Sequence, residues 1–253
     1  MNKKRLATAF LVTLQLPLIT FSCEYKNHQE LEKEKPKKID TKKDQIKKEI
    51  DKLDFIDHKN KHLQIKINKK RELKINQATE VQISRTIDGD TFEIINPKKD
   101  GTTRIRFSGV DTPEKYNPKT KELTKGVQYE YALKASNYTE NFVRSKKITN
   151  IYIVPQKTSS SPIGGEDIYD HYGRVVAIIY GLDKDNKVIN LNYELVKNGF
   201  ALKKYISLNP YNRFYTTNKD YYYLLEYGQK QAKNNKVGIW EHEKLLTQIY
   251  PKN

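Results

Sequence analysis

The first third of the chain is too polar and lysine-rich to build a hydrophobic core of its own. From Glu24 to about Ile75 it is dominated by lysine, glutamate, aspartate and asparagine, and it contains no glycine. This is the composition of a solvated tether. Strand-like apolar stretches begin only at about Glu80. We therefore expect one folded domain over residues 76–253 rather than two small ones.

Apolar residues inside the tether recur at helical spacing. They are Ile46, Ile50, Leu53 and Phe55 or Ile56. A short amphipathic helix could therefore form there. We interpret the segment as a spacer, with a helix that contacts a membrane surface or a partner as the alternative.

The N-terminus has the form of an export signal. Residues 1–22 combine three basic residues, an apolar run from Leu6 to about Thr20 and a short polar exit. Gln15 and Pro17 interrupt the run, which is short for a helix that spans a membrane. We therefore expect a cleaved signal peptide and an exported protein.

The only cysteine of the chain, Cys23, lies where the signal would be cut. The segment from Leu18 to Cys23 resembles a bacterial lipoprotein signal, although Phe21 precedes Ser22 and the leucine lies further upstream than in the strict pattern. We therefore predict that Cys23 is lipidated and that a tether over residues 23–75 holds the domain on a membrane. Simple secretion is the alternative.

The chain is strongly basic, with 47 lysines and arginines against 31 acidic residues and a formal net charge of +16. Such a surface attracts polyanions, so nucleic acid and anionic membranes are the natural partners. A compositional bias toward lysine and asparagine would give the same charge. The charge therefore permits these partners without identifying one.

Apolar periodicity predicts strands interleaved with helices, in a β-rich α+β order that fits a small barrel with peripheral helices. Strands are expected on both sides of the turn Asp88–Asp90, after the turn-forming segment Asn96–Gly101, and over Ile148–Val154 and Arg174–Tyr180. Helices are expected over Leu123–Val143, Tyr193–Asn198 and Lys219–Lys233. After the second turn, a half-buried strand should carry Arg104 and Arg106 on its outer face.

Polar residues gather at the ends of the predicted strands and in tight turns: Asp88, Asp90, Arg106, Asp111, Glu114 and Arg174. Asp88 and Asp90 are two positions apart, so their carboxylates face the same side of an extended backbone. Pro113 favours an extended Thr112, which leaves the Thr112 carbonyl free to point at a ligand. Calcium takes such oxygen ligands, so Asp90, Asp111 and Thr112 could form an open shell. Taken singly, these segments are more often only turns with solvated acids.

Hydrolysis of a phosphodiester needs a base for water, positive charge for the transition state and a group that holds the phosphate. Glu114 could orient or deprotonate the water. Arg106 and Arg174 carry planar donor forks that suit phosphate oxygens. Arg104, two residues before Arg106, is interpreted as a solvated arginine.

Two other features carry less weight. The five histidines are scattered and, with one N-terminal cysteine, form no zinc pattern, which argues against a histidine-based nuclease. The cluster Tyr221–Tyr223 lies on a predicted helix, where packing in the core is favoured over stacking on bases.

Three blocks of the chain resemble, in order and spacing, the signatures of staphylococcal-type thermonucleases: Ile87–Thr91, Arg106 with Val110–Glu114, and Asp170–Arg174 with Ala177 and Tyr180. Glu194–Ala201 and Gly238–Trp240 extend the resemblance to about Glu80–Glu241. It implies a five-stranded OB-fold barrel with three helices. It also implies a calcium-dependent nuclease that cleaves DNA and RNA with little sequence preference and leaves 3′-phosphate ends.

The resemblance implies roles position by position. Calcium would be bound by Asp90, Asp111 and the Thr112 carbonyl, with Asp88 as a neighbouring carboxylate; Glu114 would be the general base, Arg106 and Arg174 the catalytic arginines, and Tyr172 and Tyr205 part of the nucleotide pocket. The loop Gln156–Asp167 is longer than usual in the family, and Ser207 stands where a second pocket tyrosine is expected.

The expected partners are DNA and RNA, preferably single-stranded or frayed, and a membrane through the lipid anchor. No protein partner is implied, and a monomer is expected. One alternative is a catalytically inactive OB-fold lipoprotein that only binds nucleic acid. Another is a basic surface lipoprotein that adheres to polyanions, which leaves the three motif blocks unexplained.

Overall fold

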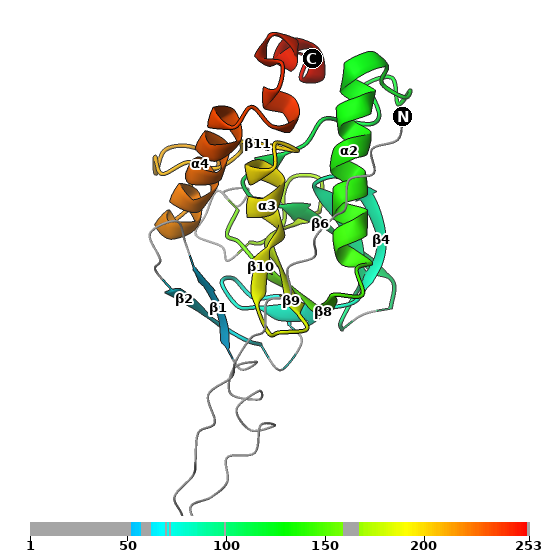
Figure 1. The fold of residues 1–253 in the computed structure, drawn as a ribbon. Helices are drawn as coiled ribbons and strands as arrows, with labels where there is room; N and C mark the ends of the chain where they lie inside the picture. Colours follow the sequence, from blue (N-terminus) through cyan, green and yellow to red (C-terminus); the bar gives the residue numbers. More distant parts are fainter. Residues whose placement is uncertain are drawn as a thin grey trace, which may run out of the picture. The chain divides into compact units, whose positions relative to one another are not determined.

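The computed structural model describes residues 52–56, 62–68, 70, 72–98, 100–158 and 167–251. The expected signal peptide, Cys23 and the first part of the expected tether lie outside these residues. The described part has a strand-rich α+β fold, as predicted (Figure 1). Within it, no helix combines the length and the apolar character that crossing a membrane requires.

A seven-stranded sheet organises the domain, in the order β3-β8-β9-β6-β5-β4 with β10 on the other side of β9. Its strands are β3 (Thr79–Val81), β4 (Ile83–Asp88), β5 (Thr91–Ile95), β6 (Thr102–Phe107), β8 (Ile148–Pro155), β9 (Val175–Asp183) and β10 (Val188–Asn190). Strands β6 and β9 are parallel, and the other neighbours are antiparallel. Only Gln82 separates β3 from β4, although these strands end the order on opposite sides. The sheet therefore curls round on itself.

The strand β6 shows why this sequence makes a two-faced strand. Ile105 and Phe107 are buried, and Phe107 packs edge-on against Phe92 of β5 with 5.0 Å between ring centroids. Arg104 and Arg106 alternate with them and lie on the opposite face. The prediction of a half-buried strand with two arginines on the face opposite its apolar residues is confirmed.

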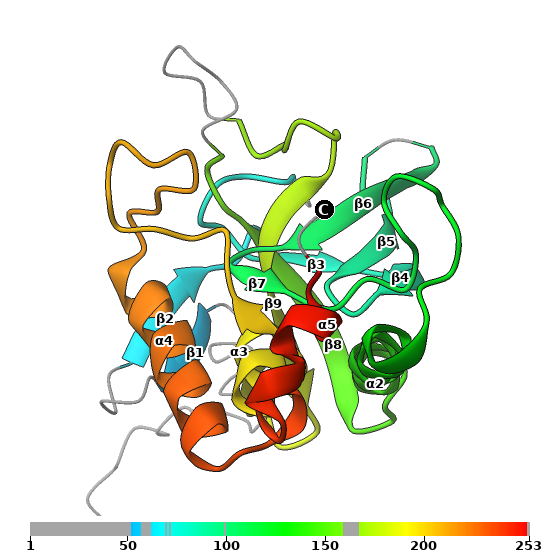
Figure 2. The same ribbon diagram turned by 90° about the horizontal axis from the view of Figure 1, so that it is seen from above.

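The helices are α2 (Gly126–Val143), α3 (Leu191–Lys197), α4 (Lys219–Asn234) and the short α5 (Leu246–Ile249), with 3-10 turns η1 (Gly238–Trp240) and η2 (Glu243–Leu245). Figure 2 shows them gathered on one side of the domain, with β4, β5 and β6 on the other. Helix α2 packs on β4, and α3 contacts both β9 and α4.

The three predicted helices are present; α4 begins at Lys219 as predicted, whereas the starts of α2 and α3 are shifted. Helix α2 begins at Gly126 rather than at Leu123, because Leu123 forms a β-bridge with Tyr116. Helix α3 begins two residues before Tyr193, because the Asn190 side chain accepts a hydrogen bond from the Tyr193 N–H and caps the helix.

The expected tether helix is not present where the structure describes that segment. Residues Lys52–Ile56 form strand β1 and His62–Lys66 form strand β2, paired antiparallel. Leu53 and Phe55 alternate with Asp54, and such alternation is the two-residue period of a strand. The predicted helix was therefore wrong for these residues. Ile46 and Ile50, the first half of the predicted helix, lie outside the described residues.

Packing of the domain begins before the predicted boundary at residue 76. Ile67, Leu73 and Ile75 are partly buried and pack against the main core. Ile67 also forms a β-bridge with Ala78, which is fully buried. The segment just ahead of β3 is therefore part of the fold rather than spacer.

The turn after β6 is tied to two helices by buried side chains. Asn192 of α3 accepts a hydrogen bond from the Ile179 N–H at 2.9 Å and donates one to the Ser108 carbonyl at 2.9 Å. The Tyr221 hydroxyl donates to the same Ser108 carbonyl at 2.6 Å. Tyr221 is fully buried, as the core-packing interpretation predicted, whereas Tyr223 of the same cluster is 43% exposed. These bonds fix the chain between β6 and strand β7 (Val110–Asp111), which pairs with β11 (Leu202–Lys203).

Two glycines meet where α3 ends and η1 begins. Gly199 and Gly238 both have positive φ, of 69° and 58°. A Cβ on Gly199 would lie 2.1 Å from the Val237 carbonyl oxygen, and the Ile239 N–H donates to the Gly199 carbonyl at 2.9 Å. Only glycine fits this backbone approach.

We predict that Gly199→Ala lowers the free energy of unfolding by about 3 kcal/mol, because it adds a backbone clash to an unfavourable φ. Gly101→Ala is the matched control, since Gly101 has φ 102° with open space around its Cβ, and it should cost about 1 kcal/mol. Urea denaturation measures both. Equal losses in the two variants would show that the close approach adds nothing.

Candidate active site

A pocket of about 1000 Å³ lies over β6 and its neighbours β5 and β9. We call it the Arg106 pocket. Its lining includes Asp88, Asp90, Arg106, Asp111, Glu114, Tyr172, Arg174 and Tyr205. Every predicted site residue of the domain except Thr112 therefore lies in one pocket. Thr112 is buried and bonded directly to Asp90.

Arg106 lies at the base of this pocket between two buried aspartates. Its Nη1 is 2.5 Å from Asp90 Oδ2 in an ion pair without aligned hydrogen-bond geometry, and its Nη2 donates to Asp111 Oδ1 at 3.1 Å. Asp90 Oδ2 also accepts hydrogen bonds from the Thr112 N–H at 2.8 Å and the Thr112 hydroxyl at 3.0 Å. One guanidinium thus joins the turn after β4 to the segment after β6.

Sequence reasoning missed two residues that hold Asp111. Lys204 Nζ donates to Asp111 Oδ2 at 2.9 Å, and the Tyr250 hydroxyl donates to the Asp111 backbone carbonyl at 2.8 Å. Both follow Asp111 by more than 90 residues. Local sequence carries no signal for such a contact.

Helix α2 positions the turn that carries Asp88 and Asp90. The Thr139 hydroxyl donates to the Gly89 carbonyl at 2.6 Å, and the Ser136 hydroxyl donates to Asp88 Oδ1 at 3.2 Å. The backbone at Gly89 and Asp90 is a turn, so the extended geometry predicted for this pair was wrong. Both carboxylates still line the same pocket, with Asp90 directed at Arg106.

Glu114 is exposed at the rim of the pocket, yet its carboxyl lies in a crowded environment. Loss of water on its buried side and the charges of Asp90 and Asp88 raise its pKa to about 7. Burial and the charge of Asp90 likewise raise the pKa of Asp88 to about 6. A carboxyl that titrates near neutral pH can accept and release a proton under physiological conditions.

The arginine at the base of the pocket keeps its charge. Burial alone would lower the pKa of Arg106, but the charges of Asp90, Asp111 and Glu114 outweigh this effect and raise it. Burial and the charge of Asp90 raise the pKa of Asp111, against the opposing effect of Arg106. A permanent cation therefore faces carboxylates that repel one another.

Arg174 is held by a carboxylate of its own. Its Nε donates to Asp170 Oδ2 at 2.8 Å, its Nη2 lies 2.8 Å from the same oxygen, and its backbone N–H donates to Asp170 Oδ1 at 2.9 Å. The guanidinium also lies 5.1 Å from the ring centroid of Tyr172, which is 71% exposed. Asp170 therefore fixes this arginine in the pocket wall.

Aromatic side chains form another wall, and sequence reasoning found only part of it. Tyr205 lies with its ring centroid 5.0 Å from that of Phe214, and Tyr215 lines the same pocket. Ser207 forms a β-bridge with Tyr215. Tyr215 thus lies beside the position where the expected second tyrosine is replaced by Ser207. The aromatic, arginine-containing composition of Tyr211–Tyr215 could have drawn attention to this wall. Composition alone does not show which of these residues lies beside Ser207.

Arg104 is exposed, as expected for a solvated arginine, but its side chain also has a fixed partner. Its side chain is 59% exposed, but it lines the Arg106 pocket and donates from Nε to Glu93 Oε1 at 3.0 Å. Glu93 lies directly opposite it on β5. The cross-strand pairing, which sequence spacing alone did not specify, directs this side chain.

The donor set of the pocket suits a hard cation. Asp88, Asp90, Asp111 and Glu114 all line the pocket, and the charges of the last three act directly on Arg106. Within the described residues, no three acidic, histidine or cysteine side chains form a ready cluster for a metal. The protein could therefore supply two aspartates and the Thr112 carbonyl, with water and substrate completing the shell.

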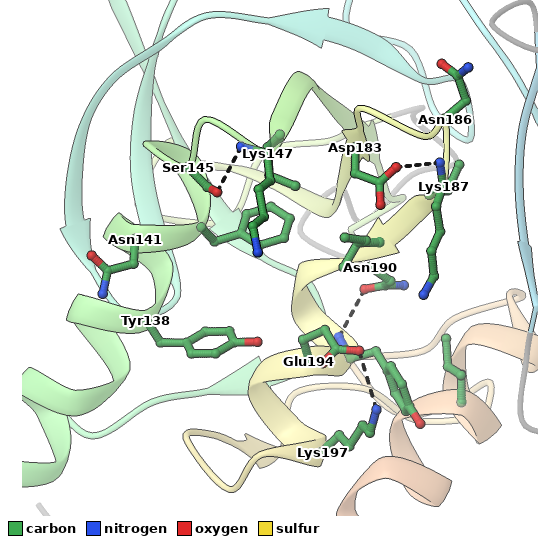
Figure 3. Close-up of a pocket in the computed structure, with 16 residues that line it drawn as sticks. Tyr138, Asn141, Ser145, Lys147, Asp183, Asn186, Lys187, Asn190, Glu194 and Lys197 are labelled. Carbon is green, nitrogen blue, oxygen red and sulfur yellow. Dashed lines mark hydrogen bonds and ion pairs between the residues drawn. The ribbon is translucent and has the colours of Figure 1, made fainter. Parts of the chain in front are cut away.

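Figure 3 shows another hollow, of about 850 Å³, between the end of α2, β10 and α3. Its two acidic side chains are already engaged, because Asp183 accepts a hydrogen bond from the Lys187 N–H at 2.8 Å and Glu194 lies 3.7 Å from Lys197 Nζ. It contains none of the predicted site residues. We therefore take the Arg106 pocket, and not this hollow, as the candidate active site.

Much of this pocket lies in a part of the chain that matches a known protein family. The family model described as staphylococcal nuclease homologue matches residues 104–242. The match includes Arg106, Asp111, Glu114 and Arg174, and it begins after Asp90. It covers more than half of the chain.

Individual relatives carry related names. A thermonuclease of Staphylococcus intermedius is 33% identical over 159 residues, which are 63% of this chain and 74% of that protein. A thermonuclease of Staphylococcus hyicus is 32% identical over 160 residues, 63% of this chain and 75% of that protein. Endonuclease YhcR of Bacillus subtilis is 27% identical over 167 residues, which are 66% of this chain but only 12% of that longer protein.

We predict that Arg106→Met lowers the free energy of unfolding by about 3 kcal/mol, because it leaves Asp90 and Asp111 buried without their shared cation. Urea denaturation measures the change. Adding Asp90→Asn and Asp111→Asn should recover part of the loss, since the repulsion is then removed.

Arg104→Met is the matched control for this prediction. Its side chain is 59% exposed, so the change should stay within about 1 kcal/mol. A loss in Arg106→Met no larger than in this control would contradict an organising role for the buried arginine.

Proposed function

The chain belongs to the staphylococcal nuclease homologue family, and from this premise we propose that it is an exported, calcium-dependent nuclease that hydrolyses the phosphodiester bonds of DNA and RNA. The membership identifies a nuclease-type hydrolase. The proposal adds three points to this membership: the enzyme requires calcium, it is exported, and it cleaves DNA and RNA alike. The observation that carries it is the Arg106 pocket. Glu114 lines this pocket together with Arg106 and Arg174, and carboxylates hold both arginines in place.

The two arginines are suited to hold the phosphate under attack. Arg106 is fixed by Asp90 and Asp111, and Arg174 by Asp170. Because these contacts exist before substrate arrives, little reorganisation is needed when negative charge develops on the phosphate oxygens. The two guanidinium groups donate hydrogen bonds to the non-bridging oxygens.

Glu114 acts as the general base. It accepts a proton from a water molecule while the water oxygen bonds to phosphorus. The bond between phosphorus and the 5′-oxygen breaks, the departing oxygen takes up a proton, and the phosphate stays on the 3′-oxygen. Its pKa of about 7 and its place at the exposed rim let Glu114 pass the proton on to solvent.

Asp90, Asp111 and the Thr112 carbonyl are the proposed calcium ligands, and Asp88 is a neighbouring carboxylate that accepts hydrogen bonds from the Gly89 N–H and the Ser136 hydroxyl. The carboxylate oxygens of Asp90 and Asp111, which both line the pocket beside Arg106, support a divalent ion there. When bound, calcium would supply positive charge to the phosphate and its attacking water. An oxygen site of low affinity suits an environment where calcium is abundant.

The exposed aromatic wall supports a preference for single-stranded or frayed nucleic acid. Tyr172 and Tyr205 are 71% and 42% exposed, and both line the pocket. Unpaired bases can stack on such rings regardless of sequence. We propose that Tyr215, 36% exposed, takes the stacking place left open by Ser207.

The strand order supports an OB-type barrel. If β3 and β4 are counted as one bent strand interrupted at Gln82, the order joins five strands and returns to its start. We propose that the sheet closes in this way.

The location is a proposal from sequence alone. Residues 1–22 would be removed on export, and Cys23 would carry the lipid that anchors the monomeric enzyme to a membrane. The mass of the mature N-terminus is the test: a diacylated or triacylated Cys23 is expected, and an unmodified start elsewhere would leave simple secretion.

The proposed function is tested by cleavage of single-stranded DNA and RNA oligonucleotides with the full chain, in calcium and in a calcium chelator. Cleavage is expected only with calcium. Glu114→Gln should lower kcat by about 10²- to 10⁴-fold, since it removes the base. Glu130→Gln, at an exposed position of α2, is the matched control and should keep full activity.

Tight binding of both oligonucleotides without cleavage would instead identify an inactive nucleic-acid-binding module. Undiminished cleavage in the chelator would contradict the calcium requirement alone. Undiminished cleavage by Glu114→Gln would contradict the role of the base.

A further inference from the structure

Arg104 extends the charged wall of the Arg106 pocket. It lies two residues before Arg106 on β6, so both side chains leave the same face of the strand, about 7 Å apart along the backbone. The parallel register of β6 and β9 pairs Ile105 with Val175. Arg104 and Arg174 come directly before these paired residues, and both line the pocket together with Arg106.

A buried carboxylate holds Arg104 in this position. Glu93 is only 7% exposed and lies opposite Arg104 on β6 and opposite Arg85 on β4. Arg85 donates from Nε to Glu93 Oε2 at 2.6 Å and from Nη2 to Oε1 at 3.1 Å. Hydrogen bonds from Arg85 and then Arg104 hold the pKa of Glu93 below its usual value. Glu93 is thus a fixed anion shared by two cations.

This arrangement leaves part of Arg104 available for a ligand. Its hydrogen bond to Glu93 uses Nε alone, at 3.0 Å. In the described part of the chain, Nη1 and Nη2 of Arg104 make no other hydrogen bond. Because one carboxylate serves both Arg85 and Arg104, the cluster keeps one positive charge in excess. Arg85 does not line the pocket, whereas Arg104 does.

We propose that Arg104 binds the phosphate of a nucleotide next to the one under attack, and that Glu93 is the positioning residue that aims it. This inference rests on the proposed nuclease function. The two-residue step along β6 is comparable to the separation of consecutive phosphates in an extended single strand. The free edge of the guanidinium matches two phosphate oxygens. The ligand class is therefore a polynucleotide with at least two phosphates rather than a lone phosphodiester.

The test compares wild type with Arg104→Gln on two substrates: a single-stranded octanucleotide, and a dinucleoside monophosphate that has only the scissile phosphate. For the octanucleotide, kcat/KM should fall about 10- to 100-fold, mostly through KM, because a charge-assisted bond is lost. For the dinucleoside monophosphate it should stay within about twofold. The salt dependence of octanucleotide affinity should become shallower by about one phosphate contact.

Arg144→Gln is the matched control, an exposed arginine on the end of α2 that pairs with Glu140. It should leave both substrates unchanged. Glu93→Gln should reproduce part of the Arg104 effect on the octanucleotide alone. Equal losses on both substrates, or no loss on the octanucleotide, would overturn the inference.

The two proposals fail separately. If wild type cleaves neither substrate, the nuclease function fails, and fluorescence anisotropy of the labelled octanucleotide then decides the role of Arg104. Weaker binding and a shallower salt slope in Arg104→Gln support the phosphate contact. Binding equal to wild type overturns it.

Discussion

The site depends on a single buried guanidinium. Arg106 contacts Asp90 and Asp111 at once, and so it joins a turn held by α2 to a strand end held by Lys204. Both aspartates are buried, and a buried charge is costly unless it is paired, so Arg106 stabilises both; Asp111 also pairs with Lys204. The same contacts direct the arginine toward the pocket. Folding and chemistry therefore rely on one network.

The pocket repeats one arrangement, in which carboxylates fix Arg104, Arg106 and Arg174 before substrate binds. Asp170 fixes Arg174 through three contacts, and Glu93 fixes Arg104 through one. Donors held in this way lose little freedom when they meet a phosphate.

Local sequence predicted most strands of the main sheet, the main helices and the residues that line the Arg106 pocket, because turns such as Asp88–Asp90 and a two-faced strand such as β6 have short-range signatures. It could not supply contacts across long separations, such as those of Lys204 and Tyr250 with Asp111. It gave no sign of the partner of Arg104, because that contact depends on cross-strand pairing. In the described part of the tether it mistook strand β1 for a helix, because a short apolar segment fits both periods.

The central claim is that water attacks phosphorus in the Arg106 pocket. Its most direct test is cleavage of a defined single-stranded oligonucleotide by the full chain in water enriched in oxygen-18, with the products analysed by mass spectrometry. The account predicts fragments that end in a 3′-phosphate carrying a single oxygen-18 atom, opposite fragments that begin with an unlabelled 5′-hydroxyl. Fragments without the label on phosphate would contradict the attack of water on phosphorus, and a label on a 5′-phosphate would contradict the departure of the 5′-oxygen.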